Sequence, residues 1–205
     1  MNPSLATLAV IVGAYLVGSV SFAVVVSRLL GLPDPHSYGS GNPGATNVLR
    51  TGNKLAAALT LAGDAGKGAL AVWLAYRLGV SWGDASLATA GAALAVFLGH
   101  AYPVFHRFSG GKGVSTAAGV ALALSWPLGV SLLGIWLAFA LLFRMASLAS
   151  LAAAAAAPPL GLYFIGNWPE AWALFPIALL LIWRHRANVK RLVAGQEPKI
   201  GAKRS

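Results

Sequence analysis

The stretch LAAALTLAGDAGKGALAVWLAYRL, residues 55–78, decides the fold class of this chain. It is apolar over the length that a helix needs to cross the hydrocarbon core of a membrane, about 20 residues. Two opposite charges, Asp64 and Lys67, lie three residues apart near its centre. Because charged side chains inside a membrane are costly, we expect this pair to face a bundle interior or a polar cavity. Its spacing is compatible with a functional role and with a structural ion pair.

The composition of the whole chain agrees with a membrane protein. Of the 205 residues, 58% are hydrophobic and 10% are charged, and the mean hydropathy is +0.72. A water-exposed globule of this size would have no core large enough for that apolar surplus. The net charge of +10 would suggest a nucleic acid partner in a soluble protein, but here the basic residues gather in loops between apolar segments. We therefore attribute the charge to membrane orientation and expect no nucleic acid partner.

Apolar segments recur along the chain, and seven of them predict membrane helices. The segments are 5–30, 55–78, 85–102, 114–124, 128–143, 148–165 and 171–183. The fourth is too short to span alone and is also compatible with a half-helix continued by the fifth across Trp126 and Pro127, which leaves five or six spans open. The predicted fold is an all-α polytopic transmembrane helix bundle in a single domain, 1–205, with a flexible basic tail at 198–205.

The basic residues sort the connections into two sets. Lys and Arg occur in alternate connections and in the C-terminal tail, whereas residues 81–84, 125–127 and 167–170 contain none. Since cytoplasmic loops carry the excess of Lys and Arg, this pattern predicts an N-terminus outside and a C-terminus inside. Trp82, Trp126 and Trp168 fall at the outer segment ends, where indoles anchor at the headgroups.

The first inner connection, residues 34–47, is rich in glycine and amide side chains and is followed by Arg50. Its glycines satisfy the G-x-G-x-x-G pattern of dinucleotide-binding folds, but that motif must follow a strand, and here it follows a membrane helix. A more general reading is an anion site made by backbone N–H groups at the start of the next helix. An ordinary polar turn is the alternative. The candidate ligands are Ser40, Gly41, Asn42, Gly44, Thr46 and Asn47.

The next inner connection ends in Gly110-Gly111-Lys112-Gly113 and opens an apolar helix. It is not a Walker loop, because His106 stands where that motif needs glycine and Gly113 where it needs Ser or Thr. A lysine flanked by glycines at a helix start can clamp a phosphate by its charge and the surrounding N–H groups. The alternative is a lysine that extends to the membrane edge, and the three neighbouring glycines favour the phosphate site.

Two further places carry polar side chains on the inner side. If the tail is helical, neighbouring turns carry Arg184, His185, Asn188 and Arg191. On spacing alone, membrane orientation and anionic lipid are the favoured explanation of basic residues there. Ser147 and Ser150 would donate to an anion or cap and pack their helix. The absence of Cys excludes disulfides and thiolate chemistry, and no residue spacing indicates a metal site or cofactor. None of His100, His106 and His185 has an acid four residues later, as the usual acyltransferase base would.

These motifs resemble those of the bacterial acyl-phosphate-dependent glycerol-3-phosphate acyltransferases, the PlsY family, over residues 27–197. Two departures from the family pattern are Pro35-His36, where Ile-Arg is usual, and Ser115, where alanine is common. If the missing arginine steadies a substrate phosphate, substrate affinity would depend on pH through His36. The matching blocks are Ser27, Arg28, Asp34 and 39–47; Asp64, Lys67 and Gly68; Gly99, His100, Pro103, Phe105, Phe108 and 110–114; and Arg184, His185, Asn188, Arg191, Leu192, Gly195 and Glu197.

The resemblance implies transfer of a fatty acyl group from acyl phosphate to the sn-1 hydroxyl of glycerol 3-phosphate, in the cytoplasmic (inner) membrane of a bacterium and with the active site facing the cytoplasm. Membrane lipid is then the surrounding partner, no cofactor or metal is needed, and a monomer suffices. The base is either His185 or a substrate phosphate, and the phosphate held by each loop stays open. The implied catalytic residues are Arg50, Lys112, Ser150 and His185, and the implied phosphate-binding residues are Ser40, Gly41, Asn42, Gly44, Thr46, Asn47, Gly110, Gly111, Gly113, Ser147, Asn188 and Glu197.

Two other classes of protein use similar features. A transporter for an anionic phosphorylated solute would employ the same loops with the short fourth segment as a broken helix, but such folds usually contain paired halves and this sequence has no internal repeat. A structural or lipid-binding membrane protein would use the basic loops to attract anionic headgroups.

Overall fold

The computed structural model describes residues 3–200, and every regular element in that range is helical. The predicted all-α fold is therefore confirmed, while residues 201–205 of the predicted basic tail lie outside the described range. In chain order the elements are α1 (Pro3–Gly18), α2 (Phe22–Leu29), α3 (Ala45–Val48), η1 (Leu49–Thr51), α4 (Lys54–Trp82), α5 (Ala85–Ala101), η2 (Val104–His106), α6 (Val114–Leu124), α7 (Trp126–Phe143), α8 (Ala146–Ile165), α9 (Pro169–Arg184) and α10 (Arg186–Val193).

All seven apolar segments are helical, but they are not equally suited to cross a membrane. By length and composition, α4, α5 with its extension to His106, α7 and α8 qualify as spans, and α1 with α2 forms a fifth, bent span. The helix α6 has 11 residues and α9 has 16. The expected break between the fourth and fifth segments is present at Ser125, and Pro127 lies in the first turn of α7, where its missing N–H costs nothing.

The first segment departs from the prediction of one continuous helix over 5–30. It breaks after Gly18, and α2 continues at an angle of 43°. Ser19 lies at the break, where its backbone N–H and its hydroxyl both donate to the carbonyl of Tyr15 at 2.9 Å. Such a bond from a serine hydroxyl to the carbonyl four residues earlier tends to bend a helix. The carbonyl of Val20 then accepts a hydrogen bond from Lys67 Nζ of α4 at 2.7 Å, so the group exposed by the break is satisfied. The sequence pattern could not predict a break whose hydrogen-bond partner lies in another helix.

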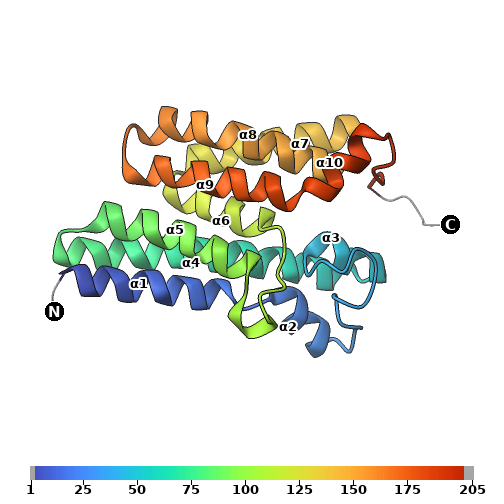
Figure 1. The fold of residues 1–205 in the computed structure, drawn as a ribbon, viewed down its shortest axis with the longest axis horizontal. Coiled ribbons are helices and arrows are strands. Elements are labelled where there is room, and N and C mark those ends of the chain that lie inside the picture. The colour runs from blue at the N-terminus through green and yellow to red at the C-terminus, as the bar shows by residue number, and fades with distance from the viewer. Residues whose placement is uncertain (1–2, 201–205) are drawn as a thin grey trace.

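The helices pack in two groups joined through α6. In Figure 1, α1, α4 and α5 form one group and α7, α8 and α9 the other; α6 packs on α4 and α7, and α9 also contacts α5. Glycines bring the helix backbones together. A Cβ at Gly99 would collide with the carbonyl of Tyr15 in α1, and one at Gly119 with the carbonyl of Ala65 in α4. Such close approach is how helices associate in lipid, which offers no hydrophobic drive between them.

We expect Gly119→Ala to destabilise the bundle by roughly 1–3 kcal/mol, because the added methyl group must push α6 away from the backbone of α4. Thermal unfolding in detergent measures the effect as a lower Tm. Gly66→Ala is the matched control, since a Cβ at Gly66 meets no atom within 4 Å. Equal Tm values for the two variants would contradict the close α4–α6 contact.

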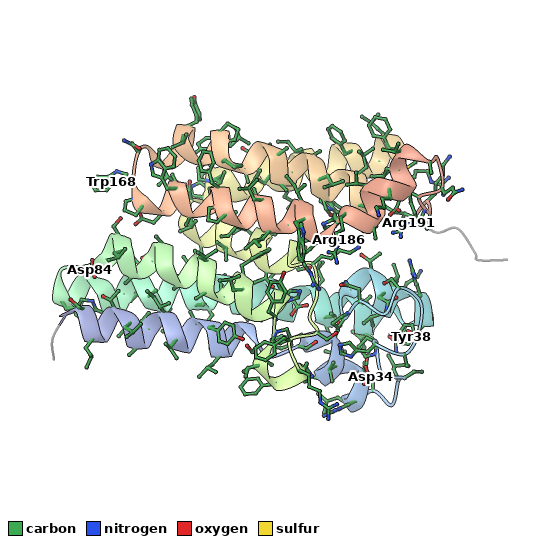
Figure 2. All side chains as sticks on the ribbon, in the orientation of Figure 1. Asp34, Tyr38, Asp84, Trp168, Arg186 and Arg191 are labelled. Carbon is green, nitrogen blue, oxygen red and sulfur yellow. The ribbon has the colours of Figure 1, made fainter. Side chains whose placement is uncertain are left out.

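The polar connections gather at one end of the bundle. In Figure 1 the α2–α3 connection and α10 lie at the right-hand end and the α5–α6 connection lies nearer the middle, whereas the α4–α5 and α8–α9 turns lie at the left with the start of α1. Figure 2 accordingly shows Asp34, Tyr38 and Arg191 at one end and Asp84 and Trp168 at the other. The two sets of connections predicted from charge are thus separated in space, and the compartment that each end faces stays a prediction.

Candidate functional site

The first inner connection is held in shape by the buried amide of Asn47. Its Oδ1 accepts from the backbone N–H of Ser40 at 3.0 Å and from the Ser40 hydroxyl at 3.2 Å. Its Nδ2 donates to the carbonyls of Pro35 at 2.8 Å and Tyr38 at 3.2 Å. Since an amide group offers two donors and two acceptor positions, the Asn47 side chain is fully used inside the loop. The structure therefore gives Asn47 the task of shaping the loop.

Glycine is required where this loop turns. Gly39 and Gly41 both have positive φ, 62° and 65°, and a Cβ at Gly39 would collide with Asn47 Oδ1 and crowd the side chain of Arg50. The loop then enters α3 at Gly44. Ser40, Gly41 and Thr46 are exposed and Asn42 and Gly44 are half-buried, so these five predicted ligands lie at the surface of the polar end.

The second glycine-rich loop is clamped from two sides. Arg184, at the end of α9, donates from Nη2 to the carbonyl of Gly110 at 2.6 Å and from Nε to that of Gly111 at 3.2 Å. On the opposite side, the N–H of Gly111 donates to the carbonyl of His100 in α5 at 3.1 Å. The Arg184 guanidinium also lies over the ring of Tyr102, 5.3 Å from its centroid. The backbone just before Lys112 is thus fixed between α5 and α9.

A chain of polar contacts connects Lys112 to α10 and the C-terminal segment. Lys112 Nζ donates to Asn188 Oδ1 at 2.6 Å, Asn188 Nδ2 donates to Glu197 Oε1 at 2.6 Å, and Arg191 Nε donates to Glu197 Oε2 at 2.7 Å. The cation and the carboxylate at the two sides of Asn188 define which way its amide points. Three of the predicted site residues, Lys112, Asn188 and Glu197, are therefore in direct contact.

The electrostatic environment of Lys112 is unusual for a lysine. The pKa of Lys112 is lowered to about 8, mainly by burial and also by the positive charges of Arg191, Arg184 and Arg50, while Glu197 acts in the opposite direction. Burial opposes ionisation of Glu197, but the hydrogen bonds from Asn188 and Arg191 hold its pKa below the usual value. The arrangement concentrates cations that only one carboxylate partly balances, as an anion site requires.

His185 follows the last residue of α9 and is 2% exposed. Its Nδ1 lies 2.8 Å from the carbonyl oxygen of Leu181. Because a carbonyl only accepts, Nδ1 carries the proton and Nε2 keeps its lone pair. The pKa of His185 is lowered to about 4, because burial, together with the positive charge of nearby Lys112, outweighs the hydrogen bond to Leu181. At neutral pH the imidazole is uncharged.

Ser147 and Ser150 are both buried near the start of α8. The Ser150 hydroxyl donates to the carbonyl of Ala146 at 2.7 Å and accepts the indole N–H of Trp136 at 3.1 Å. The contacts of Ser150 thus join α8 to α7, whereas the buried Ser147 hydroxyl has no hydrogen-bond partner among residues 3–200.

His36 connects the two glycine-rich loops. Its Nδ1 lies 2.8 Å from Asp34 Oδ1, and its Nε2 lies 3.2 Å from the carbonyl oxygen of Ser109. Both partners are acceptors, so only the doubly protonated ring satisfies both contacts. The residue that departs from the family pattern therefore occupies a bridging position, and its effect on pH dependence stays a prediction.

Three residues of this site were not predicted as site residues. For Arg184 and Arg191 the sequence pattern favoured membrane orientation, and only the tertiary fold shows that they hold the loop and Glu197. His100 was considered only as a base. The signal that could have identified it is a polar ring inside an apolar segment, since such residues need a partner; its Nδ1 lies 3.5 Å from Asp64 Oδ1.

Comparisons with known proteins identify the family of the chain. Residues 8–195 match the family described as glycerol-3-phosphate acyltransferase. The glycerol-3-phosphate acyltransferase of Cupriavidus taiwanensis is 60% identical over 98% of this chain and 99% of its own length. That of Ralstonia nicotianae is 57% identical over 100% of this chain and 99% of its own.

Solved structures give the same result. The crystal structure of PlsY, an integral membrane glycerol 3-phosphate acyltransferase, in its glycerol 3-phosphate form has a TM-score of 0.86 at 38% identity, covering 95% of this chain and 96% of that one. Its lysophosphatidic acid form has a TM-score of 0.85, also at 38% identity, covering 95% of each chain. This protein therefore belongs to the PlsY family of integral membrane glycerol-3-phosphate acyltransferases.

Proposed function

We propose that this enzyme transfers a fatty acyl group from acyl phosphate to the sn-1 hydroxyl of glycerol 3-phosphate and releases lysophosphatidic acid and inorganic phosphate. The observation that carries the proposal is the half-buried Lys112, held by Asn188 and surrounded by Arg50, Arg184 and Arg191. Both proposed substrates carry phosphate, and the similar PlsY structures hold glycerol 3-phosphate and lysophosphatidic acid.

The chemistry suits a site made of positive charge and N–H groups. The sn-1 oxygen attacks the acyl carbonyl carbon, the bond from that carbon to the phosphate oxygen breaks, and phosphate leaves with the electron pair. Because an acyl phosphate is already activated, orientation and neutralisation of the leaving phosphate supply most of the catalysis. In this proposal Lys112 and Arg50 provide that charge together with Ser150 and Asn188, and the other phosphate is held by Ser40, Gly41, Asn42, Gly44 and Thr46. Asn47 shapes the first loop. The site around Lys112 is completed by Gly110, Gly111, Gly113, Ser147 and Glu197.

The proton of the attacking hydroxyl needs an acceptor. His185 is neutral, but with a pKa of about 4 it is a weak base. A phosphate monoester oxygen, with a second pKa of about 6, is stronger. We therefore propose that a substrate phosphate takes the proton and that His185 orients the reactants through its Nε2 lone pair.

His185→Ala tests this assignment. We expect kcat to fall about tenfold, because an orienting contact is lost, while the pH profile keeps its shape. The measurement is kcat against pH from 4 to 8 in both proteins. Loss of activity by more than about a thousandfold, with disappearance of an acidic limb, would instead identify His185 as the base.

The low pKa of Lys112 predicts an alkaline limit to activity. The phosphate site needs the cation, and a lowered pKa means that the proton is lost near pH 8, earlier than from an ordinary lysine. We expect kcat/KM for glycerol 3-phosphate to fall above pH 8 in the wild type. Lys112→Arg should remove this decline, since Arg stays charged, and identical profiles for the two proteins would refute the role of the Lys112 charge.

The direct test is to incubate the purified enzyme with acyl phosphate and labelled glycerol 3-phosphate and to look for labelled lysophosphatidic acid. Acyl-CoA in place of acyl phosphate should give no product, which tests the donor. Uptake of glycerol 3-phosphate into sealed vesicles without product would favour the transporter.

The same features bear on the cellular location and the oligomeric state of the enzyme. We propose that the polar end faces the cytoplasm from the inner membrane of a bacterium, because it carries the basic connections and the relatives are bacterial. We also propose that it acts as a monomer and one domain, since Lys112, Asn188, Glu197 and Arg184 all come from a single chain.

A further inference from the structure

A buried cluster of charged and polar side chains lies inside the bundle, behind the Lys112 loop. Asp64 and Lys67 of α4 are 2% and 4% exposed, and His100 of α5 is 7% exposed. Lys67 Nζ lies 2.7 Å from Asp64 Oδ1, and His100 Nδ1 lies 3.5 Å from the same oxygen. Ionisable groups at such a place are costly, so their retention calls for an explanation.

Packing alone does not explain the pair. A buried ion pair is often no more stabilising than apolar residues of similar volume. Lys67, however, also donates to the carbonyl of Val20 in the break between α1 and α2, at 2.7 Å. An apolar residue could not make that contact. The cluster therefore joins the bent first span to α4 and α5.

The other side of the cluster faces the glycine-rich loop. The carbonyl of His100 accepts the N–H of Gly111, a Cβ at Gly110 would collide with that same carbonyl, and a Cβ at Gly111 would collide with the His100 ring. The loop therefore rests directly on His100, with no room for a side chain between them. Arg184 holds the two glycine carbonyls from the opposite side. The residue that follows is Lys112.

We propose that Asp64, Lys67 and His100 are positioning residues that hold the Gly110–Gly111 backbone against α5 and thereby place Lys112 beside Asn188. The importance of this positioning for catalysis rests on the proposed function. The structural claim itself concerns only where the Lys112 side chain lies. A cluster that merely packed α4 against α5 would leave Lys112 where it is.

The test measures the position of Lys112 without using activity. The intact enzyme is treated with an amine-reactive reagent, which labels each lysine in proportion to its neutral fraction. The labelled protein is then digested, and mass spectrometry measures the labelling of the peptide that contains Lys112. In the wild type the labelling midpoint should lie near pH 8. In Asp64→Asn/Lys67→Met, which removes both charges at once and leaves no unpaired ion, a displaced Lys112 becomes solvated. We expect its midpoint to rise by at least one pH unit and its labelling at pH 8 to fall by at least about fivefold.

The control variant is Arg77→Met, which removes a charge from the same helix α4 at a place where the side chain lies over Trp73; its midpoint should not move. If the double variant fails to fold, His100→Gln serves instead, because it keeps an N–H donor for Asp64 but removes the ring under Gly111. Lys67→Arg in the otherwise wild-type enzyme keeps the charge and an N–H donor, so its Lys112 midpoint should equal that of the wild type.

A folded double variant, or folded His100→Gln, whose Lys112 midpoint matches the wild type would overturn the proposal. A shifted midpoint together with a higher KM for glycerol 3-phosphate supports both the positioning role and the proposed function. A shifted midpoint in an enzyme that makes no lysophosphatidic acid even as wild type supports the positioning role and contradicts the proposed function alone.

Discussion

Lys112→Ala is expected to lower kcat/KM for acyl transfer by about a hundredfold to a thousandfold, the loss seen when one preorganised donor to a developing anion is removed. Lys112 is half-buried, and its ammonium group is directed at Asn188 among Arg50, Arg184 and Arg191. Electrostatic interactions are stronger in such a partly desolvated place than in water. The variant removes the ammonium group, whose positive charge is more compact than that of the neighbouring arginine side chains.

The measurement is steady-state formation of labelled lysophosphatidic acid from acyl phosphate and labelled glycerol 3-phosphate. Lys190→Ala is the matched control, because Lys190 is exposed on α10 close to the same end of the bundle. We expect less than a twofold change for this control. Small and equal effects of both substitutions would mean that Lys112 only anchors the chain at the membrane edge.

Gly111→Ala is expected to lower kcat/KM on the order of a hundredfold without a large loss of folded protein. The new methyl group would collide with the imidazole of His100, which is buried and held near Asp64. Because α5 is packed against α1, α4 and α9, we expect the loop backbone to shift away from His100 and to displace Lys112. A displacement of about 1 Å is enough to cost a factor of about a hundred in rate.

The control for this substitution is Gly66→Ala, where the added methyl group reaches open space on α4. Near-normal kinetics are expected for it, with both variants checked for monodispersity in detergent. Normal activity of Gly111→Ala would show that the loop accepts a side chain against His100. In that case the close contact between Gly111 and His100 would not matter for function.

The helices could be predicted from the sequence because membrane helices depend on local properties. Every segment from 55–78 onwards is a continuous apolar run, and lipid requires each backbone group to be satisfied within its own helix. The interruption at Gly18 escaped that reasoning, because the partner of the Val20 carbonyl is Lys67, distant in sequence. The pattern of 5–30 is as apolar as that of a continuous helix.

The candidate site was only partly predictable for a related reason. Glycine-rich loops beside Arg50 and Lys112 indicate phosphate binding through residue type alone. The sequence does not show that the Asn47 amide bonds inside its own loop or that Arg184 bonds the Gly110 carbonyl. These contacts depend on which segments the fold brings together. A basic residue just inside a membrane looks the same in sequence whether it orients the helix or holds a loop.

The sequence by itself determined that this chain is an all-helical membrane protein with its polar loops in two sets and that it resembles one family, because hydropathy, charge and motif order are properties of the chain alone. Only the tertiary structure decided that Lys112 contacts Asn188, that Arg184 and His100 enclose the glycine pair, and that Lys67 caps a broken span. Hydrogen bonds and desolvation depend on distances between segments far apart in sequence, and those distances exist only after the helices have packed.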